Sequence, residues 1–156
     1  MNRRILFVCL GNICRSPAAE GVFKHLLELK GLSAHYYIDS AGTGPWHVGK
    51  KADARMREAA EKRGVKITSI ARQFQIKDLD EFDLILTMDN DNLSSLQDIA
   101  RENCPDKISK IKPILSYAKS SSVEEVPDPY YGSQDGFEIV LDLLELCCEG
   151  LIDQTS

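Results

Sequence analysis

Residues 5–17 read ILFVCLGNICRSP, and this stretch determines how the rest of the chain is interpreted. Residues 5–8 are a short apolar run, which is typical of a buried strand. Pro17 and the apolar positions after it predict a helix, with Ser16 as its N-cap and Gly31 just past its end. A strand, a short loop and a helix N-terminus form an anion-binding cradle, because backbone N–H groups and the helix dipole point into it.

Strand and helix patterns alternate along the rest of the chain. Three further runs have strand character: residues 36–38, 83–87 and part of 108–115. Three further segments have apolar positions at helical spacing: residues 52–60, 93–100 and 137–148. Asp89 is the predicted N-cap of one of these helices, Gly150 follows the last, and residues 40–45 and 119–132 are predicted loops. This order predicts an α/β fold, a three-layer sandwich with a central four-stranded parallel sheet and helices on both faces. Such sheets bind ligands beyond the carboxyl ends of their strands, where residues 9–16 would lie.

Length and composition narrow the class of protein. A chain of 156 residues predicts a single domain, residues 1–156. The formal net charge of -5, with no block of Lys or Arg, argues against a nucleic-acid partner. No run approaches the ~20 apolar residues of a membrane span, so none is expected. The five cysteines are odd in number and have no metal-ligand spacing, which predicts reduced thiols, no metal site and a cytoplasmic location.

Cys9 and Arg15 bracket the loop that follows the first strand. A thiol is an effective nucleophile as its thiolate, and a helix dipole stabilises an anion by only about 0.3–1 kcal/mol. Loop N–H groups and the Arg15 charge would add hydrogen bonds to a charged group, at about 1.5–3 kcal/mol each. An Arg at a helix N-terminus is itself unfavourable unless an anion binds there. The pair therefore predicts phosphoryl transfer through Cys9, with no metal and no cofactor, rather than a packed Cys and a surface Arg.

The other loop residues have more than one interpretation. Gly11 is expected either to adopt a positive φ or to allow a close backbone approach. Asn12 tolerates the left-handed region and can brace the loop through its side chain. Ser16 can cap the helix and donate to the Cys9 sulfur. Cys14 is open between a reversible disulfide with Cys9 and a simple packing role.

Asp128 is the candidate general acid. Pro127 and Pro129 flank it and restrict the backbone, so the segment can present one carboxyl group on a stiff loop, although Asp-Pro is also common in ordinary turns. Three aromatic residues are predicted to wall a slot for a phosphotyrosine ring: Trp46, Tyr130 and Tyr131. His47, beside Trp46, is expected at the rim. Any one of these aromatics alone would more often be packing.

The chain resembles the low-molecular-weight protein tyrosine phosphatases over nearly its whole length. The resemblance is carried by five segments: residues 8–17, 39–43, 71–73, 83–89 and 128–130. It implies Cys9 as nucleophile, Arg15 as phosphate clamp and Asp128 as acid and then base. The phosphate-binding loop would also include the following residues: Leu10, Gly11, Asn12, Ile13, Cys14 and Ser16. The resemblance implies that Asn12, Ser16 and Ser40 brace this loop, whereas the chain has Ser69 where relatives often have a His.

The resemblance implies hydrolysis of phosphotyrosine in a protein substrate through a phosphocysteine, with inorganic phosphate as product. A thiol-dependent arsenate reductase is an alternative on the same fold, but it needs a relay of cysteines, and Cys104 stands alone. A non-catalytic phosphate-binding or phosphotyrosine-binding module is a second alternative. Such a module has no need of both Cys9 and Asp128.

Overall fold

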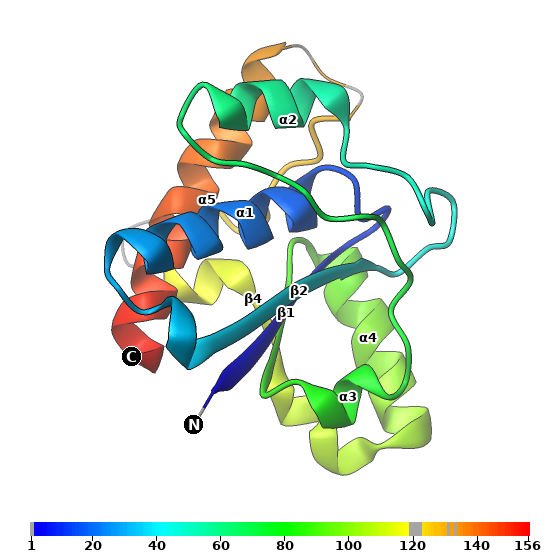
Figure 1. Ribbon diagram of the computed structural model, residues 1–156. Helices are drawn as coiled ribbons and strands as arrows, with labels where there is room; N and C mark the ends of the chain where they lie inside the picture. The colour runs from blue at the N-terminus through cyan, green and yellow to red at the C-terminus, as the bar shows by residue number, and fades with distance from the viewer. Residues whose placement is uncertain (1, 119–122, 131, 133) are drawn as a thin grey trace.

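A computed structural model describes residues 2–118, 123–130, 132 and 134–156 (Figure 1). Four strands occur within these residues: β1 (Arg3–Cys9), β2 (Tyr36–Gly42), β3 (Leu84–Thr87) and β4 (Ile111–Pro113). They form one sheet in the order β2-β1-β3-β4, in which every neighbouring pair is parallel. The predicted α/β fold with a four-stranded parallel sheet is therefore confirmed.

Helices cover both faces of the sheet (Figure 1). On one side lie three helices: α1 (Arg15–Leu29), α2 (Ala54–Glu61) and α5 (Gln134–Thr155). On the other side lie two: α3 (Asp78–Glu81) and α4 (Asn90–Asn103). Short 3-10 helices complete the chain: η1 (Ser33–His35), η2 (Pro105–Lys110) and η3 (Ile114–Tyr117). None of the helices in the described part of the chain is long and apolar enough to cross a membrane.

β1 lies between two hydrophobic cores. Ile5 and Phe7 belong to the core beneath α1 and α5, whereas Leu6 and Val8 belong to the core beneath α4. Successive side chains of a strand point to opposite faces, so a central parallel strand must be apolar at every position. This requirement explains why residues 5–8 are a continuous apolar run rather than an alternating one.

Several predicted boundaries differ from the structure. α1 begins at Arg15, and Ser16 is not its N-cap, because the Ser16 hydroxyl bonds within the loop instead. β2 extends through residues 40–42, which were expected in a loop. α5 continues past Gly150, where a Cβ would lie 1.8 Å from the Tyr117 carbonyl oxygen. This glycine is thus a close packing contact with η3 and not a helix terminator.

Other predictions hold or need only a shorter range. Asp89 caps α4, because its side chain accepts a hydrogen bond from the Asn92 backbone N–H. The last strand is three residues long, with η2 before it and η3 after it, and is shorter than the range 108–115 allowed. The four-residue helix α3 had not been predicted from the sequence. Residues 119–122 of the expected loop lie outside the described residues.

Candidate active site

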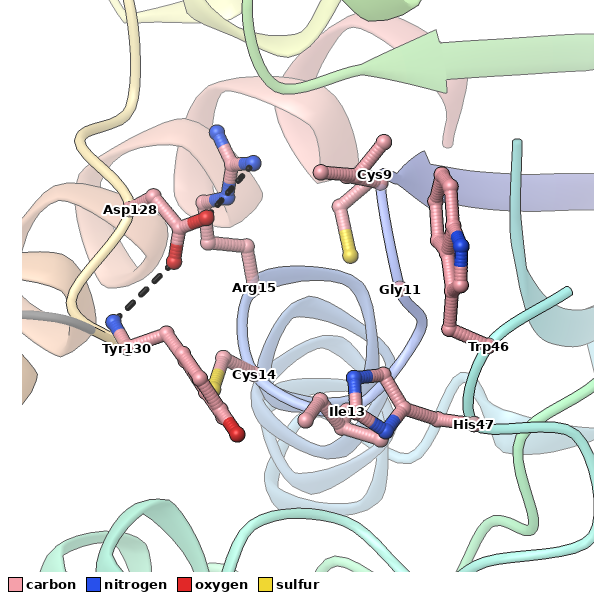
Figure 2. A pocket seen from close by; sticks show the side chains of 10 residues that line it. Cys9, Gly11, Ile13, Cys14, Arg15, Trp46, His47, Asp128 and Tyr130 are labelled. Atoms are coloured by element: carbon pink, nitrogen blue, oxygen red, sulfur yellow. Dashed lines mark hydrogen bonds and ion pairs between the residues drawn. The ribbon is translucent and has the colours of Figure 1, made fainter. Parts of the chain in front are cut away.

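A cavity of about 310 Å³ opens beyond the carboxyl end of β1 (Figure 2). Its walls come from the loop after β1, from the segment after β2 and from the segment before α5. Ten residues line it: Cys9, Leu10, Gly11, Ile13, Cys14, Arg15, Trp46, His47, Asp128 and Tyr130. The structure thus brings together most of the predicted site residues. Asn12, Ser16 and Ser40 are buried residues outside this lining, and Tyr131 lies outside the described residues.

Asn12 braces the loop from behind. It is 1% exposed and has a φ of 58°, so the left-handed residue of the loop is Asn12. Its Nδ2 donates to the Ser16 hydroxyl at 2.8 Å, and its Oδ1 accepts from the Arg72 backbone N–H at 3.0 Å. Gly11 serves the other role proposed for it, a close approach, because a Cβ there would lie 2.9 Å from the His47 ring. The Asn12 side chain and the close approach of Gly11 to His47 therefore help to hold the loop.

The Cys9 sulfur lies among hydrogen-bond donors. Cys9 is 3% exposed, and its sulfur accepts from the Asn12 backbone N–H at 3.3 Å. The Ser16 hydroxyl oxygen lies 3.1 Å from this sulfur and 3.3 Å from the Ala41 carbonyl. The Ser16 hydroxyl oxygen accepts a hydrogen bond from Asn12 Nδ2. Its single proton can go to either the Cys9 sulfur or the Ala41 carbonyl. A thiolate is the stronger acceptor. The site can therefore stabilise a negative charge on sulfur.

Arg15 is a buried cation at the mouth of the loop. Its Nη1 donates to the Asp89 carboxylate at 2.7 Å and to the Val126 carbonyl at 3.0 Å. Its Nη2 lies 3.6 Å from the Asp128 carboxylate. Burial alone would lower the pKa of Arg15, but the negative charges of Cys9, Asp89 and Asp128 raise it above its ordinary value. The guanidinium is thus charged and oriented by fixed acceptors, as a clamp for an anion requires.

The surroundings of Cys14 favour its neutral thiol. Burial raises the pKa of its thiol, and the charges of Asp53 and Cys9 raise it further. Cys14 therefore remains protonated, and Cys9 is the thiol of this pocket that has donors around its sulfur. Both are free thiols in the structure, and the proposed disulfide between them stays a prediction.

Asp128 lies beside Arg15 at the edge of the cavity (Figure 2). Its side chain is 36% exposed, and its Oδ1 accepts a hydrogen bond from the Tyr130 backbone N–H at 3.0 Å. Trp46, which is 65% exposed, stands on the other side of the opening. The ring centroids of His47 and Tyr130 are 6.1 Å apart. Aromatic rings and one carboxyl group therefore surround the entrance above the Cys9 sulfur.

Ser40 does not brace the loop in the way the resemblance implied. Its hydroxyl donates to the buried Glu20 carboxylate at 2.7 Å, and Lys24 donates to the other Glu20 oxygen at 2.6 Å. Ser40 thus fixes α1 to β2. The Ser69 side chain makes no hydrogen bond to any described residue. The bracing contact from this region comes instead from the Arg72 backbone N–H.

Two groups of residues near the site were missed from the sequence. Asp89 was interpreted only as a helix cap, and its second oxygen orients Arg15. Asp53 and Arg55, at the start of α2, link the loop to the Asp128 segment, and no local pattern marks them. No cluster of three or more His, Cys, Asp or Glu residues suited to a metal ion occurs in the described ranges.

A family model described as "Low molecular weight phosphotyrosine protein phosphatase" matches residues 4–156. The chain belongs to this family. Among low molecular weight phosphatases, it is 42% identical over 149 residues to the Bacillus subtilis protein YfkJ, covering 95% of this chain and 92% of that one. The Schizosaccharomyces pombe phosphotyrosine phosphatase is 43% identical over 139 residues, covering 87% and 86% of the two chains.

Solved structures of phosphatases superpose closely on this chain. The protein tyrosine phosphatase of Entamoeba histolytica has a TM-score of 0.93 and 45% identity, covering 98% of this chain and 96% of that one. A Drosophila protein described as an arginine phosphatase has a TM-score of 0.91 and 34% identity, covering 97% and 98%. The fold is therefore shared among phosphatases that are described by different phosphorylated residues.

Proposed function

We propose that this low molecular weight phosphatase hydrolyses phosphotyrosine in protein substrates through a phosphocysteine on Cys9. The observation that carries the proposal is the joint placement of three groups in one cavity. The Cys9 sulfur lies within hydrogen-bond distance of the Asn12 N–H and the Ser16 hydroxyl, the charged Arg15 lies beside it, and Arg15 Nη2 pairs with the Asp128 carboxylate at 3.6 Å. This is the arrangement of nucleophile, anion clamp and proton donor that phosphomonoester cleavage needs.

In the first step, the Cys9 thiolate attacks phosphorus and forms the S–P bond. The P–O bond to the phenol breaks, and protonated Asp128 delivers its proton to the departing oxygen. The N–H groups of the loop at residues 10–16 and the Arg15 guanidinium would hold the equatorial oxygens. Positioning and charge stabilisation dominate this chemistry, so a rigid loop contributes directly to the rate.

In the second step, water attacks the phosphocysteine. The Asp128 carboxylate, now a base, removes a proton from the water as the O–P bond forms. The S–P bond breaks, the Cys9 thiolate leaves and inorganic phosphate is released. The Ser16 hydroxyl and the Asn12 N–H stabilise the leaving thiolate, so they assist this step as well.

The walls of the cavity favour an aromatic phosphate ester. Leu10 and Ile13 supply apolar surface, and Trp46 and Tyr130 supply rings that can stack on a phenol. We further propose that residues 1–156 act as one phosphatase domain, because one sheet lies between both cores. The chemistry needs a reduced Cys9 thiol, which supports action in the cytoplasm.

The test is hydrolysis of p-nitrophenyl phosphate from about pH 4.5 to about pH 8 without added metal, since the pH profile reports the acid and the base. Wild type and Cys9→Ser are compared under reducing conditions. Activity on the acid side of neutrality that Cys9→Ser abolishes would support the proposal. Phosphopeptide binding without turnover by either protein would instead identify a binding module.

Phosphoarginine is a second candidate substrate, because the Drosophila neighbour is described as an arginine phosphatase. Matched peptides with phosphotyrosine or phosphoarginine would separate the two, and the aromatic walls predict a higher kcat/KM for phosphotyrosine. The arsenate alternative has less support. Cys104 packs against the core beneath α4 and does not line the cavity.

A further inference from the structure

Arg55, near the start of α2, links two segments of the site that are distant in sequence. One is the phosphate-binding loop, at residues 9–16, and the other is the Asp128 segment, at residues 126–130. The second segment is anchored before Asp128, where the Val126 N–H donates to the Met88 carbonyl at 2.8 Å. Arg55 provides an anchor after Asp128.

The link starts at the phosphate-binding loop. The Asp53 backbone N–H donates to the Ile13 carbonyl at 2.8 Å. The Asp53 carboxylate then accepts from Arg55 at both of its oxygens, at 3.1 Å from Nε and 2.9 Å from Nη2. This two-point contact fixes the plane of the guanidinium, which a single contact would leave free to rotate.

The same guanidinium holds the Asp128 segment. Arg55 Nη2 donates to the Tyr130 carbonyl at 3.1 Å, across 75 positions of sequence. The guanidinium carbon also lies 5.5 Å from the centre of the Tyr130 ring and 4.8 Å from that of Phe137. The Tyr130 N–H in turn donates to Asp128 Oδ1 at 3.0 Å (Figure 2). Arg55 therefore holds the residue whose amide orients the Asp128 carboxylate.

We infer that Arg55 is a positioning residue that sets Asp128 against the phosphate-binding loop. The inference rests on the proposed function and deepens it. Arg55 reaches Asp128 through Tyr130 and touches none of the reacting atoms. The hydrogen bond from Arg55 also lowers the pKa of Asp53, against the opposing effect of burial, which favours the charged carboxylate of this pair.

The test uses the dependence of the rate on the leaving group. Phenol leaves poorly without a proton because its pKa is about 10, whereas a dinitrophenolate leaves unprotonated. We expect Arg55→Met to lower kcat/KM for phenyl phosphate by about tenfold to a hundredfold, because general acid catalysis contributes about 10²–10⁴. For 2,4-dinitrophenyl phosphate the fall should stay below about twofold, because this leaving group needs no acid. Arg55→Lys should be intermediate, since an ammonium offers no planar fork.

Arg57→Met is the matched control. Arg57 lies on the same helix, is also half-buried, and donates to the Ala52 carbonyl at 2.9 Å away from the cavity. The Arg57→Met variant should have kcat/KM values for both substrates within about twofold of wild type, because this change does not displace the general acid.

Three results would overturn the inference: equal losses with both substrates, no loss with phenyl phosphate, or an Arg57→Met effect as large as that of Arg55→Met. Absence of a cooperative thermal transition in both Arg55 variants would assign the residue to stability instead. Inactive wild type would refute the proposed function itself. If wild type is active and Arg55→Met loses kcat/KM equally for phenyl phosphate and 2,4-dinitrophenyl phosphate, the positioning role alone would be refuted.

Discussion

Replacing Asn12 tests whether one left-handed residue holds the phosphate-binding loop. Asn12 has a φ of 58° and is 1% exposed. It contributes one side-chain donor to Ser16 and one side-chain acceptor to the Arg72 N–H. The variants Asn12→Ala and Asn12→Gly remove the same two hydrogen bonds. They differ in whether the backbone can adopt the left-handed conformation without strain.

The magnitudes predict an unusual order of stability. A non-glycine residue in the left-handed region costs about 1–2 kcal/mol, and loss of a partner for a poorly solvated N–H costs about 1–3 kcal/mol. Asn12→Ala should therefore lower the free energy of unfolding by about 2–5 kcal/mol. Asn12→Gly avoids the strain, but the greater conformational entropy of its unfolded chain lowers the free energy of unfolding by about 0.4–1 kcal/mol. The glycine variant should be the more stable of the two by about 1 kcal/mol.

The assay is urea unfolding followed by circular dichroism, with the slope m checked for equality between variants. In thermal unfolding the same difference raises the Tm of Asn12→Gly above that of Asn12→Ala by about 2–4 °C for a chain of this size. An alanine variant at least as stable as the glycine variant would refute the reasoning, because the left-handed conformation would then carry no strain.

Three further outcomes are expected. Asp128→Asn should lower kcat/KM for phenyl phosphate by about 10²–10⁴ in steady-state kinetics. Its Tm should not change, because the side chain is 36% exposed, and undiminished turnover would exclude Asp128 as the acid. Asp89→Ala removes both the Arg15 partner and the α4 cap, whereas Asp89→Asn keeps the cap. Urea unfolding should find the alanine variant less stable than the asparagine variant by about 1 kcal/mol, and equal stability would contradict the cap. Burial raises the pKa of Cys147 to about 12 in the folded protein, from an ordinary value of 9.0. Its neutral thiol thus adds stability below pH 9.0 that is lost as the pH rises through about 12. Unfolding free energy should fall between those limits and fall less in Cys147→Ala, and a flat profile would count against the burial.

The sheet and its helices were predictable because their signals are local. A continuous apolar run indicates a strand buried on both faces, and Pro17 indicates the start of a helix, whatever the rest of the chain does. Where prediction was wrong, a specific side-chain or packing contact had replaced the usual preference of that residue type. Ser16 is a good N-cap residue, but the Cys9 sulfur and Asn12 engage its hydroxyl. A glycine near the end of a helical pattern often terminates the helix. At Gly150, however, the Tyr117 carbonyl packs closely and α5 continues.

The sequence by itself indicated the proposed phosphate-binding loop, because the proposed nucleophile and clamp, Cys9 and Arg15, lie six positions apart on one strand–loop–helix unit. Backbone geometry alone brings such neighbours to one cradle. Only the tertiary structure decided which groups complete the site. Asp89 reaches Arg15 across 74 positions, and Val126 reaches it across 111. These contacts depend on how α4 and the segment before α5 pack on the sheet, and spacing along the chain carries no record of that packing.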